Sequence, residues 1–272
     1  MPVFVITGAN RGLGLEFVRQ LSVDSSNTIL AATRSLSRDL KDLESLKSQD
    51  ATIHILECDT SSQDSITAFS KQVASVLGGE DKKIDFLLNN AGINATSQQT
   101  SLTMTPESLA NHINVNVMGP AKTVQVLESN LQQGSVVMNM TSGIGSLAYN
   151  RTKDPVECTT YSISKAALNM LTVHQANNLK KKGVVVICVD RKFLPLRILQ
   201  GLRPQSINSS HEHPMKTHTE LMVAGWVKTD MGGSRAVLEK EVSIGGMLKC
   251  LRGLEASDSG RYFKYDGSEM AW

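Results

Sequence analysis

Hydrophobic residues follow two alternating patterns along the chain. Short apolar runs occupy residues 3–7, 28–33, 52–57, 84–89, 135–140 and 184–189. Amphipathic stretches separate them, at residues 12–21, around 40–46 and 65–77, and at 106–131 and 160–181. Apolar runs of this kind are typical of parallel strands covered on both faces, and amphipathic stretches are typical of the covering helices. The sequence therefore predicts an α/β fold: a Rossmann-type doubly wound parallel sheet with helices on both faces, in a single domain over residues 1–272.

Residues 191–224 break this alternation. They show no sustained periodicity and contain several prolines and histidines: Pro195, Pro204, Pro214, His211, His213 and His218. So long an unstructured stretch is unusual inside a compact domain. One explanation is a substrate lid, because long loops often carry function.

The other explanation is that residues 191–224 are a translated intron. Arg191 and the two residues after it can be encoded with a splice-donor-like GTAAGT, and Val223 with Ala224 can be encoded with an acceptor TAG. Removing the segment would restore a Pro codon between Asp190 and Gly225. A mature transcript that always carries the whole segment would refute this hypothesis.

Composition and charge exclude several classes of function. The chain has 272 residues, is 40% hydrophobic and carries a net charge of +2, without a basic stripe interleaved with aromatics, so we expect no nucleic-acid partner. No apolar run reaches the roughly 20 residues of a membrane span, and strand-like residues begin at Val3, so neither a membrane anchor nor a leader is expected. The cysteines are far apart and lack metal-ligand spacing, which predicts reduced thiols, no metal and a cytoplasmic location: Cys58, Cys158, Cys188 and Cys250.

A glycine-rich loop directly follows the first predicted strand. Its residues are Thr7, Gly8, Ala9, Asn10, Arg11, Gly12, Leu13 and Gly14. Glycines allow a tight turn, and the helix that follows offers free N–H groups to a pyrophosphate, so the loop predicts a dinucleotide site. The second strand ends at Arg34 without an acidic residue to bind a ribose 2′-hydroxyl. Arg34, helped by Arg11, favours a 2′-phosphate and therefore NADP(H), with NAD(H) as the alternative.

Tyr161 and Lys165 are four residues apart in a predicted helix, so they share one face. A neighbouring ammonium favours the phenolate, which predicts a lowered pKa for Tyr161 and a role in proton transfer. A second pair with the same spacing is Tyr149 and Lys153. It is disfavoured because Pro155 follows closely and opposes a helix there.

The chain contains several further motifs besides the glycine loop and the Tyr161/Lys165 pair. They are Cys58-Asp59, Asn89-Asn90-Ala91-Gly92, Asn116-Val117-Met118-Gly119, Thr141-Ser142 and the ending at residues 260–267. With the glycine loop and the Tyr161/Lys165 pair, they make the chain resemble the short-chain dehydrogenase/reductase family. Within it, the chain is similar to the carbonyl-reductase-like branch that includes C-factor and sniffer-like proteins.

The resemblance implies a set of catalytic residues and a cofactor site. Ser142 would bind the substrate carbonyl, Tyr161 would transfer the proton, Lys165 would bind the nicotinamide ribose, and Asn116 would hold a relay water. The implied cofactor contacts are Asp59 to the adenine; Asn89, Ala91 and Gly92 beside the cofactor; and Gly225, Val227 and Thr229 at the carboxamide.

Together these observations predict an NADP(H)-dependent carbonyl reductase or alcohol dehydrogenase that acts on a small carbonyl or alcohol substrate. The apolar faces of residues 106–131 and 160–181 would pair in a homodimer or homotetramer. Two alternatives stay open. One is a cofactor-binding regulatory protein of the C-factor type. The other is an inactive product, if residues 191–224 disrupt the nicotinamide site.

Overall fold

The computed structural model describes residues 1–152, 157–191, 227 and 238–272. Of the segment 191–224, only Arg191 is among the described residues, so both hypotheses about this segment lie outside them. Gly225 and Thr229 also lie outside the described residues. The described strands form a seven-stranded sheet in the order β3-β2-β1-β4-β5-β6-β7, in which every pairing is parallel. The strands are β1 (Val3–Thr7), β2 (Thr28–Thr33), β3 (Thr52–Glu57), β4 (Phe86–Asn89), β5 (Val136–Thr141), β6 (Val185–Asp190) and β7 (Tyr262–Lys264). The predicted doubly wound α/β fold is confirmed.

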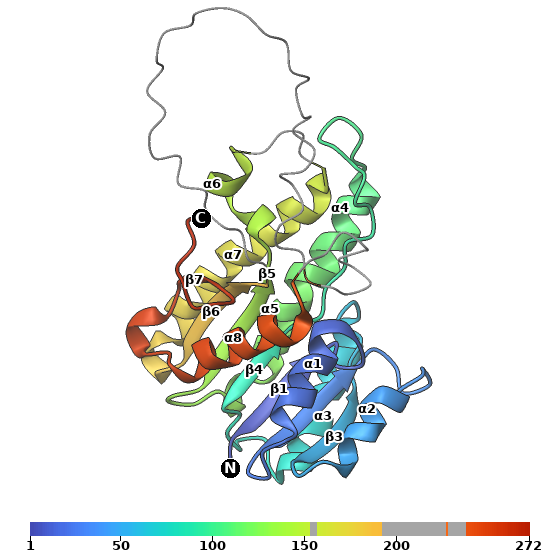
Figure 1. Ribbon diagram of the computed structural model, residues 1–272, viewed down its shortest axis with the longest axis vertical. Helices are drawn as coiled ribbons and strands as arrows, with labels where there is room; N and C mark the ends of the chain where they lie inside the picture. The colour runs from blue at the N-terminus through green and yellow to red at the C-terminus, as the bar shows by residue number, and fades with distance from the viewer. Residues whose placement is uncertain (153–156, 192–226, 228–237) are drawn as a thin grey trace, which may run out of the picture.

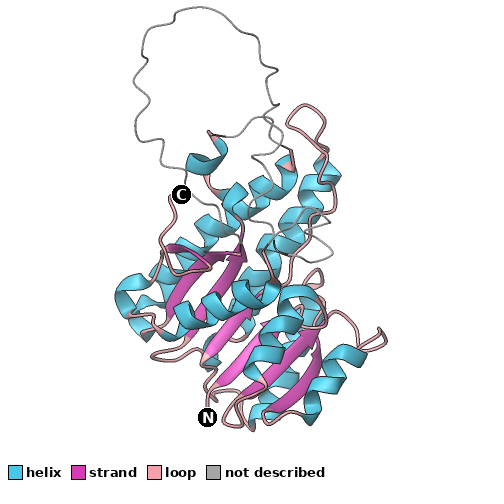
Figure 2. Ribbon diagram, viewed as in Figure 1, coloured by secondary structure: helices cyan, strands magenta, loops and turns pink. Residues whose placement is uncertain are grey.

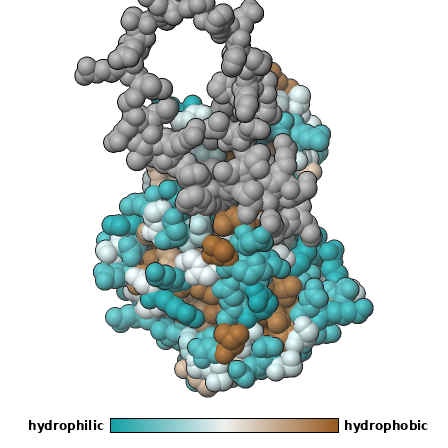
Figure 3. Space-filling model, in the orientation of Figure 1, coloured by the Kyte–Doolittle hydropathy of each residue, from teal (hydrophilic) through white to brown (hydrophobic). Residues whose placement is uncertain are grey.

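Helices cover both faces of the sheet (Figures 1 and 2). They are α1 (Gly12–Leu21), α2 (Lys41–Ser45), α3 (Gln63–Leu77), α4 (Pro106–Ile113), α5 (Gly119–Val126), α6 (Leu147–Asn150), α7 (Thr159–Leu179) and α8 (Lys240–Arg252). One buried apolar cluster joins the sheet to α1 and α8 through Phe17 and Ile244. A second joins it to α3, α5 and α7 through Phe69, Val124 and Leu179. The outer surface over α1 and α8 is mostly polar, with separate apolar spots (Figure 3).

The first strand lies between β2 and β4, so the direction of winding reverses on its two sides. Loops that leave neighbouring strands in opposite directions open a crevice at the carboxyl ends of those strands. The glycine loop after β1 and the loop after β4 meet there. The fold thus places the candidate site at this crevice.

The helix predicted over residues 106–131 is helical without interruption only to Val126, and it is not a regular α-helix. A π-helical turn, η2 (Asn114–Met118), separates α4 from α5, and α5 ends at Val126. The Gly119 N–H donates to the Asn114 carbonyl five residues earlier, as in a π helix. Pro120 has no N–H to give the Asn116 carbonyl, so a regular helix cannot run through this point.

The other predicted elements differ from the structure only at their ends. The strand predicted at residues 84–89 begins at Phe86. The helix predicted at 160–181 is α7 followed by a 3₁₀ turn (Lys180–Lys182), which Gly183 ends with φ 68°. Asn139 begins an Asn-X-Thr sequon with Met140 and Thr141, but it is fully buried in β5. Within the described part of the chain, no helix has the length and apolar character to cross a membrane.

Candidate active site

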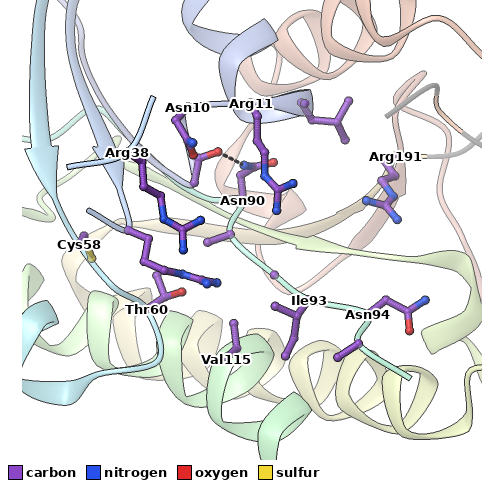
Figure 4. Close-up of a pocket in the computed structure, with 17 residues that line it drawn as sticks. Asn10, Arg11, Arg38, Cys58, Thr60, Asn90, Ile93, Asn94, Val115 and Arg191 are labelled. Atoms are coloured by element: carbon purple, nitrogen blue, oxygen red, sulfur yellow. Dashed lines mark hydrogen bonds between the residues drawn. The ribbon is translucent and has the colours of Figure 1, made fainter. Parts of the chain in front are cut away.

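A cavity of about 420 Å³ opens at the crevice, which is within the ordinary size range of small-molecule sites (Figure 4). Predicted cofactor residues contribute much of its wall: Gly8, Asn10, Arg11, Gly12, Leu13, Arg34, Ala91 and Gly92. The remaining lining residues are Arg38, Cys58, Thr60, Asn90, Ile93, Asn94, Ala95, Val115 and Arg191.

The glycine loop has the shape that the sequence predicts. Gly8 and Gly12 have φ angles of 67° and 56°, which favour glycine. A Cβ atom at Gly14 would lie 2.1 Å from the Gly8 carbonyl oxygen, so helix α1 approaches the loop too closely for any side chain there. The N-cap of α1 is Arg11, whose side chain makes no capping hydrogen bond, and the first turn carries no acidic residue. Its backbone N–H groups suit an anionic ligand.

Asn90 fixes the glycine loop from the neighbouring strand. Its Nδ2 donates to the carbonyls of Thr7 at 2.9 Å and Gly8 at 3.3 Å. The Thr7 hydroxyl oxygen in turn accepts from the backbone N–H groups of Asn90 and Ala91, both at 3.1 Å. Thr7 therefore braces the loop from behind instead of lining the cavity. The site prediction omitted Asn90, although its motif was recognised.

Arginines gather at the β2 end of the cavity. Arg34, Arg38 and Arg11 all line it, and Figure 4 shows Arg38 and Arg11 directed into the opening. Arg38 was not predicted, because it follows β2 in a loop without a pattern. Asp59 is outside the lining set and lies 3.9 Å from Arg34. Burial acts to raise the pKa of Asp59, but hydrogen bonds from Ser61 and the nearby arginine charges lower it below its usual value.

Asn89 lies behind the cavity and bridges the central strands. Its Nδ2 donates to Asn139 Oδ1 on β5 at 2.9 Å. Asn139 then donates to Thr172 and Gln175 on α7, both at 2.9 Å. Asn89, predicted to lie beside the cofactor, instead links β4 to β5 and does not line the cavity.

Tyr161 and Lys165 both lie in the buried N-terminal half of α7. The Lys165 ammonium is 5.6 Å from the centre of the Tyr161 ring and donates to the Met140 carbonyl at 2.7 Å. Ser142 follows β5 immediately and is fully buried. Its hydroxyl makes no hydrogen bond to any described residue. It nevertheless lies close enough to Tyr161 to favour the phenolate slightly.

The pKa of Tyr161 is raised, so the predicted lowering is wrong for this structure. Burial of the phenol is the main cause; the Arg191 charge partly offsets it, and Asp190 adds to it. The Lys165 ammonium contacts the ring face and a carbonyl instead of the phenol oxygen. The pKa of Lys165 is lowered to about 7, mainly by burial and also by the positive charge of Arg191.

Asn116 lies in the π turn and connects the loop after β4 to α7. Its Nδ2 donates to the Ile93 carbonyl and to Ser164 Oγ, both at 2.9 Å, and its Oδ1 accepts from the Ile93 N–H at 2.8 Å. Ser164 Oγ donates in turn to the Tyr161 carbonyl at 2.7 Å. Three hydrogen bonds thus hold the Asn116 side chain, and Ser164 connects it to the Tyr161 backbone.

His112 is a site residue that no sequence motif indicated. It is fully buried on α4, and its ring lies 6.3 Å from the Tyr161 ring at a 66° angle. Its Nδ1 lies 2.8 Å from the Ser108 carbonyl, and its Nε2 lies 3.1 Å from the Ala95 N–H. A carbonyl can only accept and an N–H can only donate, so the ring is neutral with its proton on Nδ1.

The remaining predicted residues lie away from these groups or outside the described chain. Val227 is buried in the core and forms a parallel bridge with Leu238, and it does not line the cavity. Tyr149 is on the short helix α6, where burial raises its pKa to about 12; Lys153 falls outside the described residues. Across residues 1–152, 157–191, 227 and 238–272, no three His, Cys, Asp or Glu side chains gather as metal ligands.

Comparison with known proteins points to one family. The family model for short chain dehydrogenase matches residues 2–195. The C-signal protein of Myxococcus xanthus is 30% identical over 191 residues, which cover 70% of this chain and 93% of that protein. The 1-hydroxy-2-glutathionyl-2-methyl-3-butene dehydrogenase of Rhodococcus sp. (strain AD45) is 26% identical over 272 residues and covers 100% of both chains.

Solved structures agree with this assignment. The NADPH-bound carbonyl reductase from chicken fatty liver superposes with a TM-score of 0.80 at 27% identity, with 100% of both chains covered. The carbonyl reductase Sniffer of D. melanogaster gives a TM-score of 0.78 at 25% identity, again over 100% of both chains. With its glycine loop, its parallel sheet order and its Ser142/Tyr161/Lys165 arrangement, the chain belongs to the short-chain dehydrogenase/reductase family of oxidoreductases.

Proposed function

We propose that this protein is an NADP(H)-dependent reductase of small carbonyl compounds, able to run the reverse alcohol oxidation. The observation that carries this proposal is the buried Tyr161 phenol beside the Ser142 hydroxyl, which has no hydrogen-bond partner among the described residues. A raised pKa keeps the phenol protonated at neutral pH, as a proton donor must be. The NADPH-bound chicken carbonyl reductase supports the same reading.

The cavity suits an NADP-type cofactor. The α1 N-terminus and the close glycine loop would hold a pyrophosphate. Arg34, Arg38 and Arg11 would bind a 2′-phosphate through charge-assisted hydrogen bonds, where NAD(H) would offer them only a hydroxyl. The bound cofactor would supply hydride chemistry, and the protein would supply placement and proton transfer.

The protein's own residues account for the acid–base part of the reaction. Ser142 would donate a hydrogen bond to the substrate carbonyl oxygen and polarise it. Tyr161 would give its proton to the same oxygen as negative charge develops there. Asn116 and Lys165 would keep α7 and the Tyr161 ring in position through their contacts with Ile93, Ser164 and Met140. We also propose that Asn116 holds a water molecule that relays protons to the site, as the family resemblance implies.

The test uses the full chain, NADPH and a panel of aldehydes, ketones and quinones. Tyr161→Phe should lower turnover about 100-fold or more, because it removes the proton donor and leaves the ring. Tyr149→Phe is the matched control and should keep turnover within a few-fold of wild type. Retained turnover in Tyr161→Phe, with loss in Tyr149→Phe, would transfer the role to the second tyrosine.

A regulatory function is the second candidate, and the similarity to the C-signal protein favours it. In that case the chain would bind NADPH but oxidise it with no carbonyl compound in the panel. An inactive chain is distinguished by deleting residues 191–224 and inserting Pro after Asp190. Turnover only in the deleted form would identify the segment as the cause.

We also propose that the protein pairs with a second copy through α5 and α7. A groove of about 340 Å³ runs between these helices, and its apolar lining includes Ala121, Val124 and Leu171. Met170 projects from the same helix with 60% of its surface exposed. Pairing of two copies across a two-fold axis here would cover both the groove and Met170. We therefore propose a homodimer or homotetramer, located in the cytoplasm.

A further inference from the structure

The backbone of Ser142 is held by a residue from the far end of the chain. The Tyr262 hydroxyl on β7 donates a 2.8 Å hydrogen bond to the Ser142 carbonyl. The Gly145 N–H donates to the same oxygen at 2.7 Å. A carbonyl oxygen has two lone pairs, so these two donors satisfy it and define the orientation of the peptide.

Tyr262 is itself firmly placed. It is fully buried, and it pairs with Cys188 in the β6–β7 register. Its carbonyl accepts from the Met270 N–H at 2.8 Å, and its ring lies 5.3 Å from the Trp272 ring. Burial raises the pKa of Tyr262 far above its ordinary value, so the hydroxyl is a donor at any pH used for an assay.

The same C-terminal segment contacts the Ser142 loop at three further points. Ser146 Oγ donates to the Ala271 carbonyl at 2.7 Å, and the Ala148 N–H donates to the Trp272 carbonyl at 3.0 Å. A Cβ atom at Gly143 would lie 3.3 Å from the Met270 methyl group, so this loop packs directly on the segment. The loop after β5 is therefore fastened to residues 262–272 along its length.

We propose that Tyr262 is a positioning residue that acts through Ser142. By fixing the Ser142 peptide, it directs the serine hydroxyl toward the substrate carbonyl oxygen. This inference rests on the proposed function, in which Ser142 binds that oxygen. The Ser142 hydroxyl is buried beside Tyr161 and has no hydrogen-bond partner among the described residues, so it is available to donate to a substrate oxygen.

A double-mutant cycle tests the proposal. Tyr262→Phe removes one oxygen atom and keeps the ring on Trp272. It should lower kcat about 10-fold, with the dissociation constant for NADPH unchanged. Combined with Ser142→Ala, it should cause no further loss, because its effect passes through the serine. Tyr265→Phe, on the turn that follows β7, is the matched control and should leave kcat as in wild type.

The other outcomes are separable. The inference is overturned if Tyr262→Phe has the kcat of wild type. It is also overturned if the decrease in kcat in the double variant is the product of the decreases in the two single variants. Wild-type turnover in Ser142→Ala instead overturns the assigned role of Ser142 in the proposed function. Thermal unfolding is measured for each variant. If Tyr262→Phe does not fold, Trp272→Leu is used instead, because it removes the ring that packs against Tyr262. The decrease in kcat caused by Trp272→Leu must then likewise be absent when Ser142→Ala is also present.

Discussion

The Lys165 ammonium lies over the face of the Tyr161 ring, 5.6 Å from its centre, and donates its hydrogen bond to the Met140 carbonyl. The cation therefore stabilises the ring by a cation–π contact instead of stabilising a phenolate. Burial then determines both proton equilibria. The pKa of Tyr161 is raised and that of Lys165 falls to about 7, so near neutral pH the phenol keeps its proton while about half of the Lys165 side chains are charged.

Stability should rise with pH because of Lys165. Its pKa is about 7 in the folded protein and 10.5 ordinarily, so the unfolded chain binds more protons between these values. The free energy of unfolding should increase by about 1.5 kcal/mol from about pH 7 to about pH 8.5, and this contribution is lost as the pH falls through the folded value. Urea titrations measure it.

Lys165→Met is the comparison for that experiment, since it removes the amine and keeps a long side chain. The wild-type chain should show the increase and the variant should not. Above pH 8.5 the buried thiols of Cys58 and Cys188, whose pKa values are raised, act with the opposite sign. Equal slopes for the two proteins would contradict a deprotonated Lys165.

Arg34→Ala should weaken NADPH selectively. Removing a charge-assisted contact to a 2′-phosphate costs roughly 1.5–3 kcal/mol, so KM for NADPH should rise about 10- to 100-fold while KM for NADH stays near its wild-type value. Steady-state kinetics with both cofactors measure the ratio. Lys71→Ala removes an exposed charge on α3 outside the cavity and should leave both constants unchanged. A parallel rise for both cofactors would argue against 2′-phosphate binding.

Gly14→Ala should abolish cofactor binding. The added Cβ would meet the Gly8 carbonyl oxygen at 2.1 Å, so the loop or the helix must shift. NADPH fluorescence titration should show a loss of affinity of at least about 100-fold. Gly245→Ala is the control within α8, where the nearest atom would be at an ordinary 3.6 Å. It should bind normally and unfold at the same or a higher temperature.

His112→Phe should destabilise the protein. The change preserves a buried ring but leaves the Ala95 N–H without its acceptor and removes the bond to the Ser108 carbonyl. An unpaired buried polar group costs about 1–3 kcal/mol. Chemical denaturation measures the loss, and His54→Phe on the edge strand β3 should cost less than about 0.5 kcal/mol. Equal costs at the two histidines would be inconsistent with a special role for His112.

Leu171→Arg should produce a monomer. The arginine would replace one of the apolar side chains in the groove between α5 and α7 by a charge, which an interface between two copies would bury. Light scattering after gel filtration should show half the mass of the wild-type dimer, or less if the native form is a tetramer. Lys180→Glu, beyond the end of α7, changes charge without touching the groove lining and should keep the native mass.

Much of the fold followed from the sequence because buried parallel strands need continuous apolar runs. The glycine loop and the Tyr161/Lys165 pair were equally visible, since turn geometry and helical spacing are local properties. Strand β7 could not be predicted from periodicity, because three residues are too few to show a period. Proline at position 120 is a usable sequence signal for the π turn before α5.

The parts of the site that were missed depend on tertiary contacts. His112 becomes a neighbour of Tyr161 only when α4 packs against α7, and no spacing along the chain reveals that. The sign of the Tyr161 pKa shift likewise depends on depth of burial, which a pair of residues four apart does not specify. Arg38 and Arg191 reach the cavity from opposite sides, each from a loop without periodicity.

Strand β7 follows every other strand in the chain, yet its first residue contacts the serine that follows β5. During translation the ribosome would release the cofactor loop, the helix bearing Tyr161 and six strands of the sheet before Tyr262 emerges. At about 5–20 residues per second, several seconds separate the synthesis of Asp190, at the end of β6, from that of Tyr262, so the Ser142 carbonyl gains its second hydrogen-bond donor only after the other six strands have been made.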